Sequence, residues 1–171
     1  DFKIGSPTPN DGITGQVGGF VMYNRVLSEG DVLDNFNSVK SRYIPTYGSL
    51  IFEPGLTAGA GVQLTETSND WEAGYSDFTA EVWFKAFDIS GISGVISNRS
   101  LNGPNGFDIN IFEGYLEFWT IGSYNNIEID TNKWYHAAIS RYDGTSMCYL
   151  NGVKVFEFSD NNNYTNNTIS I

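Results

Sequence analysis

Short stretches in which apolar and polar residues alternate are the feature of this sequence that most constrains its fold. The clearest is Phe78–Lys85, whose first, third, fifth and seventh residues are apolar. Because successive side chains of a strand point to opposite sides, an alternation of period two predicts a half-buried β-strand. Trp83 is the one large apolar residue on the otherwise polar face of this stretch.

Nine further runs have strand-like patterns and are separated by turn signals. They are Ser49–Glu53, Gly61–Thr65, Gly94–Ser97, Phe107–Phe112, Tyr115–Ile121, Ile127–Ile129, Trp134–Tyr142, Ser146–Leu150 and Val153–Phe158. Asp143-Gly144, Asn151-Gly152 and Glu113-Gly114 favour tight hairpin turns between them. An aromatic content of 15% and 19 glycines are also typical of strands joined by tight turns.

One segment has a different periodicity. Ser28 can cap a helix, and apolar residues then recur at helical spacing as far as Lys40. Residues 160–167 are rich in Asn and lack periodicity, which predicts a surface loop. We therefore predict an all-β chain, a two-sheet antiparallel jelly-roll sandwich with one short helix, with a closed barrel as the alternative.

Length and charge exclude several classes of protein. The 171 residues suit one domain, and 20 acidic against 9 basic residues give a formal net charge of −11. A chain with this charge and no basic stripe is not expected to bind nucleic acid. Membrane insertion is not expected either, because no apolar run approaches the ~20 residues of a membrane helix. Cys148 stands alone, so no internal disulfide is expected.

Three stretches together resemble the laminin-G-like, concanavalin A-like lectin/glucanase family of β-sandwiches. Residues 77–85 (DFTAEVWFK) are similar to an early core strand of that family. Residues 132–141 (NKWYHAAISR), with the hairpin at 148–152 (CYLNG), are similar to a later strand pair. Residues 15–28 (GQVGGFVMYNRVLS) are similar to its closing strand and the entry to a short helix. The resemblance covers most of the chain and implies the sandwich fold.

The order of these stretches departs from the family. Residues 1–46 are similar to the closing strands and short helix, and residues 47–171 to the opening and central strands, whereas a family member has them in the reverse order. Phe2–Gly5 and Thr168–Ile171 both resemble the same strand of the sandwich. Three arrangements fit this order: one turn of a tandem repeat, a circular permutation, or a unit that donates its N-terminal segment to a neighbour.

Catalysis is not expected. A glucanase on this fold needs facing carboxylates, commonly at alternate positions of one strand. Glu128 and Asp130 have that spacing, but Asn132 stands where a third carboxylate belongs. His136 is the sole histidine, and without a partner Ser, Cys or second His we expect it to be structural.

Glycan and calcium are the two candidate ligands. Trp71, Tyr75, Tyr124 and Tyr164 lie among Asn and Asp residues in expected loops, and aromatic rings there can stack on sugars. The alternative is that Trp71 and Tyr75 only cover the sandwich edge. Asp160, Asn161 and Asn163 offer the oxygen ligands that calcium takes. The resemblance implies rim calcium sites without placing ligands on particular residues, and a solvated polar loop is the alternative.

The sequence thus favours a non-catalytic structural and attachment module at an extracellular or virion surface, with glycan as its ligand. The stretch from Tyr23 to Tyr43 is similar to the tails of such modules in bacterial surface proteins and in phage tail or capsid appendages. Other copies of the chain or neighbouring structural proteins are its expected partners. A purely architectural decorating or cementing role is the first alternative, and a glycoside hydrolase is the second.

Overall fold

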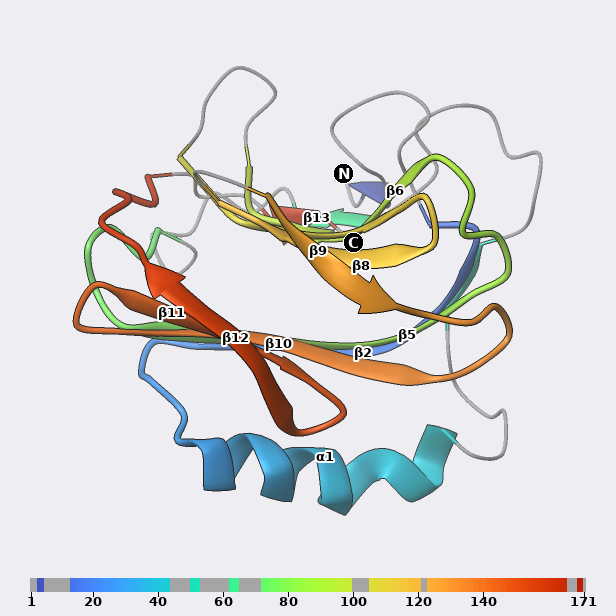
Figure 1. The fold of residues 1–171 in the computed structure, drawn as a ribbon, viewed down its shortest axis with the longest axis horizontal. Helices are drawn as coiled ribbons and strands as arrows, with labels where there is room; N and C mark the ends of the chain where they lie inside the picture. The colour runs from blue at the N-terminus through green and yellow to red at the C-terminus, as the bar shows by residue number, and fades with distance from the viewer. Residues whose placement is uncertain are drawn as a thin grey trace.

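A computed structural model describes residues 3–4, 13–43, 50–52, 62–64, 72–99, 105–120, 123–165 and 169–170. These residues form two antiparallel β-sheets stacked face to face, with one helix outside them (Figure 1). The predicted sandwich is confirmed.

Seven of the described strands form the first sheet. Their spatial order is β1 (Lys3–Ile4), β4 (Val62–Leu64), β13 (Ile169–Ser170), β6 (Ile92–Ser97), β7 (Asp108–Phe112), β8 (Tyr115–Trp119) and β9 (Ser123–Glu128). The two strands that resemble one another in sequence, β1 and β13, lie on either side of β4 and both pair with it.

Six of the described strands form the second sheet. Their order is β12 (Val153–Ser159), β11 (Thr145–Leu150), β10 (Tyr135–Tyr142), β5 (Phe78–Ala86), β2 (Gly15–Tyr23) and β3 (Leu50–Phe52). The N-terminal strand β2 therefore lies between β5 and β3 in the sheet of its own chain. Whether this order arose by permutation, repetition or strand donation stays a prediction.

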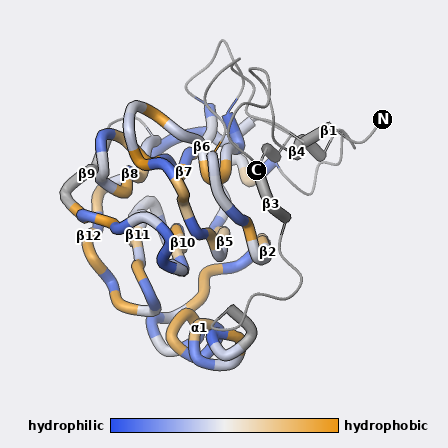
Figure 2. Tube along the Cα trace, turned by 90° about the vertical axis from the view of Figure 1, so that its right-hand side faces the viewer, coloured by the Kyte–Doolittle hydropathy of each residue, from blue (hydrophilic) through white to orange (hydrophobic). Residues whose placement is uncertain are grey.

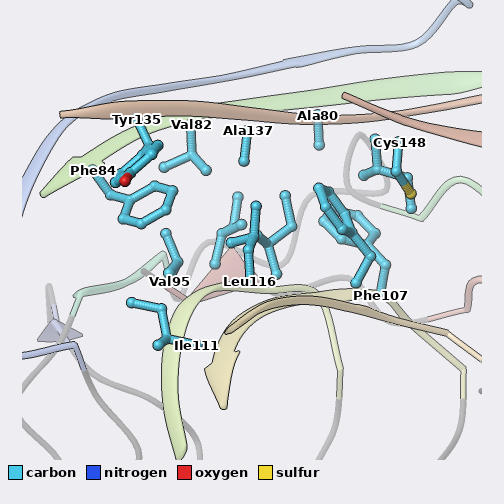
Figure 3. Packing of buried hydrophobic residues seen from close by; sticks show 14 of the residues in the cluster. Ala80, Val82, Phe84, Val95, Phe107, Ile111, Leu116, Tyr135, Ala137 and Cys148 are labelled. Carbon is cyan, nitrogen blue, oxygen red and sulfur yellow. The ribbon is translucent and has the colours of Figure 1, made fainter. Parts of the chain in front are cut away.

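The main core lies between the inner faces of the two sheets (Figure 3). Ala80, Val82 and Phe84 of β5 meet Ile111 of β7 and Leu116 of β8, and all five are fully buried. They sit at alternate positions of their strands, as the period-two pattern predicts. Burying one large aliphatic or aromatic side chain of this kind contributes about 1.5–3 kcal/mol.

A second, smaller core forms where helix α1 (Glu29–Tyr43) lies on the outer face of the six-stranded sheet (Figure 2). Ser28 caps the helix: its Oγ accepts from the Asp31 amide at 3.1 Å, and Asp31 Oδ2 accepts from the Ser28 amide at 2.9 Å. Phe36 stacks on Trp83 with ring centroids 5.4 Å apart. The helix thus covers the tryptophan that interrupts the polar face of β5.

None of the helices in the described ranges is long and apolar enough to cross a membrane.

Candidate functional site

The outer face of the seven-stranded sheet carries an unusual set of polar side chains. Because Ile109, Ile111, Leu116 and Phe118 point into the core, the intervening residues of β7 and β8 point outward. Asp108 lies opposite Trp119, and Asn110 lies opposite Glu117. We call the outward residues of this region the polar face; they are Ser97, Arg99, Asp108, Asn110, Glu117 and Trp119.

Contacts among these side chains hold the polar face together. Arg99 Nη1 lies 2.8 Å from Asp108 Oδ2, and Ser97 Oγ donates to Asp108 Oδ1. The guanidinium carbon of Arg99 lies 3.5 Å from the ring centroid of Trp119. Burial raises the pKa of Asp108, while hydrogen bonds from Ser97 and Arg99 act in the opposite direction. Each carboxylate oxygen of Asp108 thus has a hydrogen-bond partner.

Asn110 and Glu117 occupy the middle of the polar face. Asn110 Nδ2 donates to Glu117 Oε2 at 3.5 Å, and the two residues are only 8% and 6% exposed. Both side chains are therefore buried and pair with one another rather than lie open to a ligand.

Exposed apolar residues border one end of the polar face. Ile92, Phe112 and Tyr115 are paired across β6, β7 and β8 and are 46%, 41% and 38% exposed. Tyr115 and the half-buried Trp119 lie four residues apart on β8, or about 13 Å at the usual rise of a strand. Two aromatic residues at this spacing, with polar groups between them, can contact several sugar units at once.

The sequence did not identify this face as a site, because outward polar residues on strands usually only face solvent. The signal that could have found it is the pair of sequences DINIF and YLEFW around the Glu113-Gly114 turn. Their outward positions are polar in the middle and aromatic at three of the four ends, the exception being Asp108.

A second exposed region lies at the loops that contain Tyr75, which is 69% exposed. The buried Arg141 fixes these loops from below, since its Nη1 donates to the Gly74 carbonyl at 3.2 Å and to the Asn162 carbonyl at 2.9 Å. Gly74 and Tyr164 also pair as an isolated antiparallel bridge. Tyr75, one of the predicted sugar-binding tyrosines, is therefore exposed on a loop that these hydrogen bonds hold in place.

Tyr164 does not fit the predicted role on a sugar platform. Its side chain is fully buried, and its ring packs at 5.2 Å from Phe78 in an edge-on arrangement. Its hydroxyl donates to Asp160 Oδ2 at 2.6 Å, and burial followed by the Asp160 carboxylate raises the pKa of Tyr164. A ring with no exposed surface cannot stack on a ligand, so the placement of Tyr164 in an exposed loop was wrong.

The structure says less about the other two predicted sugar-binding residues, Tyr124 and Trp71. Tyr124 lies in strand β9, opposite Phe118, rather than in a loop, because residues 123–128 pair with β8. Trp71 lies outside the described residues.

The predicted calcium ligands have different environments. Asp160 is fully buried, and its oxygens accept from Ser146 Oγ, from Tyr164 OH and from the Asn162 amide. Asn161 and Asn163 are exposed. Among the residues that the structure describes, no group of three or more His, Cys, Asp or Glu side chains could hold a metal ion. Calcium binding by Asp160, Asn161 and Asn163 stays a prediction.

The other residues considered in the sequence analysis as catalytic or reactive groups lie in different parts of the structure. His136 packs beneath α1 with its ring centroid 5.2 Å from that of Trp83, and burial lowers its pKa to about 4. Cys148 is fully buried in the main core, and burial raises its pKa. Glu128 ends β9, whereas Asp130 lies beyond it on the surface, with Lys133 Nζ at 3.5 Å.

Two facing antiparallel sheets with a helix on the outer side define a concanavalin A-like β-sandwich. Residues 56–171 match the family described as the Concanavalin A-like lectin/glucanases superfamily, and the chain belongs to that family. A search of curated proteins found no match. A solved structure from Bacteroides ovatus, described as a "putative carbohydrate binding protein", is 15% identical with a TM-score of 0.48; the alignment covers 95% of this chain and 67% of that one.

Proposed function

We propose that this protein binds glycan without hydrolysing it, and that the polar face with its aromatic border is the binding surface. The observation that carries the proposal is the pair of outward aromatic residues on β8, the exposed Tyr115 and the half-buried Trp119. Sugars present hydroxyl groups at their edges and C–H groups on their faces. Aromatic rings can stack on the C–H faces, and the Tyr115 hydroxyl can exchange a hydrogen bond with a sugar hydroxyl.

The chemistry of the carboxylates supports a role without hydrolysis. A glycosidase needs one carboxyl group as acid and a second as base or nucleophile, both free to act on the bond. On the polar face, Asp108 is committed to Ser97 and Arg99. We therefore favour an attachment module of an extracellular or virion surface over a hydrolase.

A glycan array with binding-face variants tests the proposal. Trp119→Ala and Tyr115→Ala should each weaken the array signal roughly three- to tenfold, because one stacked ring contributes about 0.5–1.5 kcal/mol beyond its buried area. Tyr142→Ala is a matched control, since Tyr142 is 56% exposed on the other sheet. Reducing-sugar release from bound glycans should stay at background.

Tyr75→Ala tests the second location. Loss of binding in this variant, with Tyr115→Ala unaffected, would move the site to the anchored loops. An empty array with folded protein would favour the purely architectural role instead. Turnover that is abolished by Glu117→Gln would establish the glycoside hydrolase.

Calcium binding at Asp160, Asn161 and Asn163 stays a prediction from the sequence. Because the oxygens of Asp160 already accept hydrogen bonds within the protein, we favour the alternative of a solvated polar loop and expect millimolar Ca²⁺ to leave the melting temperature unchanged. A Ca²⁺ titration followed by thermal melting measures this. A rise in the melting temperature that Asn161→Ala removes would establish the ion site.

A further inference from the structure

The contact between Arg99 and the Trp119 ring indicates which part of that ring a glycan can reach; this inference rests on the proposed function. The guanidinium carbon of Arg99 lies 3.5 Å from the centroid of the ring. Atoms in van der Waals contact lie about 3.5–4.0 Å apart, so no other group fits between the guanidinium group and the ring. One face of the Trp119 ring is therefore closed to a ligand.

Arg99 reaches this ring from two strands away. Ser97 pairs with Asp108 and Asp108 pairs with Trp119, so these three residues form a row across β6, β7 and β8. Neighbouring strands lie about 4.8 Å apart, so a residue that follows β6 spans about 10 Å to cover a ring on β8. The long side chain of Arg99 therefore extends past Asp108 to reach Trp119.

Three contacts fix the guanidinium group in this position. Nη1 of Arg99 lies 2.8 Å from Asp108 Oδ2, and the other oxygen of Asp108 accepts from Ser97 Oγ. The amide of Arg99 donates to the same Ser97 Oγ at 3.1 Å. Asp108 is itself buried. A planar guanidinium group that a buried carboxylate already orients is well suited to stack on a ring.

We infer that Arg99 is a positioning residue for glycan binding: it holds the Trp119 ring in place and closes one of its faces, so that a pyranose stacks on the opposite face. A side chain that is fixed before binding loses little freedom when the ligand arrives, and this preorganisation increases affinity. Arg99 thus acts on the sugar through the ring, and its own guanidinium group is occupied by Asp108 and Trp119.

A double-mutant cycle tests this role. A neutral oligosaccharide that is positive on the glycan array, such as a β-glucan hexasaccharide, is titrated against the native chain, Arg99→Ala, Trp119→Ala and the double variant. We expect Arg99→Ala to weaken binding about two- to fivefold in the native chain and to have no further effect once Trp119 is replaced.

Arg25→Ala is the matched control for this cycle. It removes the same charge, and Arg25 also lies over an aromatic ring, that of Tyr23 at 5.7 Å, but in the other sheet. Affinity for the oligosaccharide should be unchanged in this variant.

Fluorine NMR reports on the ring without any glycan. The chain has four Trp residues, so labelling with 5-fluorotryptophan gives four resonances, and Trp119→Phe identifies that of Trp119. We expect Arg99→Lys to move the Trp119 resonance towards its position in the unfolded chain and to leave the other three in place. Lys keeps the positive charge beside Asp108 but lacks the planar group, so the cycle is repeated with this variant where Arg99→Ala does not fold.

The outcomes separate this inference from the function on which it rests. An equal loss of affinity with and without Trp119 would show that Arg99 acts on the glycan directly, and unchanged affinity in Arg99→Ala would show that the ring needs no support. A Trp119 resonance that stays in place in both Arg99 variants would show the same. Each of these results overturns the inference and leaves glycan binding intact. A native chain that binds no glycan overturns both, and the Trp119 resonance then still shows whether Arg99 holds the ring.

Discussion

A buried carboxyl group beneath α1 is the least expected feature at the scale of single residues. Glu81 Oε2 accepts from Asn35 Nδ2 at 2.9 Å, and the other oxygen, Oε1, lies 3.9 Å from His136 Nε2. Burial raises the pKa of Glu81 to about 7 and lowers that of His136 to about 4. Between these values both groups are neutral, which is the arrangement that a poorly hydrated site favours.

These shifts predict how stability depends on pH. The folded state holds the proton of Glu81 more tightly than the unfolded chain does, so this stabilisation is complete below pH 4.5 and is lost as the pH rises through 7. His136 acts in the opposite sense: its contribution is complete above pH 6.5 and is lost as the pH falls through 4. Stability contributed by the pair is therefore greatest at mildly acidic pH.

Glu81→Gln should remove the alkaline part of this dependence. Between pH 5.5 and pH 8.5 the native chain should lose about 1–2 kcal/mol of unfolding free energy that the variant does not lose. This figure is already reduced for partial solvent screening. Denaturant unfolding at the two pH values measures the change. Glu128→Gln, which alters an exposed carboxylate, serves as the control. Equal pH dependence in the native chain and Glu81→Gln would contradict the assignment.

At the scale of elements, the turn between β11 and β12 packs closely against α1. Gly152 has φ +78°, and a Cβ atom there would lie 2.9 Å from Leu33 Cδ1 and 3.2 Å from Leu33 Cα. The turn is also held to β10, since the His136 amide donates to Asn151 Oδ1 at 3.0 Å. Asn151-Gly152 therefore forms the predicted hairpin turn and also helps to seat α1.

Gly152→Ala should destabilise the protein more than the same change in a free turn. Gly114 provides the comparison, because its φ is +87° but a Cβ atom there would meet only Ile89 Cδ1 at 3.8 Å. We expect about 1–2 kcal/mol for Gly114→Ala from backbone strain and a further 1–3 kcal/mol for Gly152→Ala from overlap with α1. Chemical denaturation of both variants measures the difference in their free energies of unfolding. Equal losses of stability would show that α1 moves away from the new Cβ atom without destabilising the protein.

Local patterns predicted most elements, because each strand and its turn are encoded by neighbouring residues. Alternation located β5, the hairpin of β7 and β8, and the strands β10 to β12, and Ser28 located the start of α1. Strand β9 begins at Ser123 rather than at the predicted Ile127. Trp83 and Tyr164 could not be placed in this way. The environment of Trp83 depends on a helix about fifty residues earlier in the chain, and that of Tyr164 on Arg141 and Asp160. The polar face could not be predicted from local patterns either, because it brings together residues from separate strands.

At the scale of the whole molecule, the two outer sheet faces have different roles in the architecture. The outer face of the six-stranded sheet is covered by α1, whose Val32 packs with Ala138 and Tyr149 in the smaller core. On the outer face of the seven-stranded sheet, the apolar and aromatic residues Ile92, Phe112 and Tyr115 are instead exposed, while Asp108 and Glu117 are buried. The sandwich therefore places its candidate binding surface opposite the helix, where a ligand does not disturb the packing of α1.

The N-terminal segment is needed for both cores. Strand β2 pairs with β5 from Gly15 to Tyr23, and α1 covers Trp83 on the outer face of the same sheet. Without residues 1–46, β5 would become an unpaired edge, and the apolar groups beneath α1 would face water. Because the strand pairing and the cover over Trp83 are lost together, we expect the loss to exceed the 5–15 kcal/mol by which a domain is usually stable.

Deleting residues 1–46 should therefore give an aggregating or unfolded product, as measured by sedimentation and circular dichroism. A peptide of residues 1–46 added in excess should restore folding, because the pairing between β2 and β5 is antiparallel and does not require a covalent link at that edge. A peptide with Val32→Asp should rescue poorly, since Val32 is fully buried under α1. A truncated chain that is monomeric and unfolds cooperatively would show instead that residues 47–171 form a complete sandwich and that the N-terminal segment only adds to it.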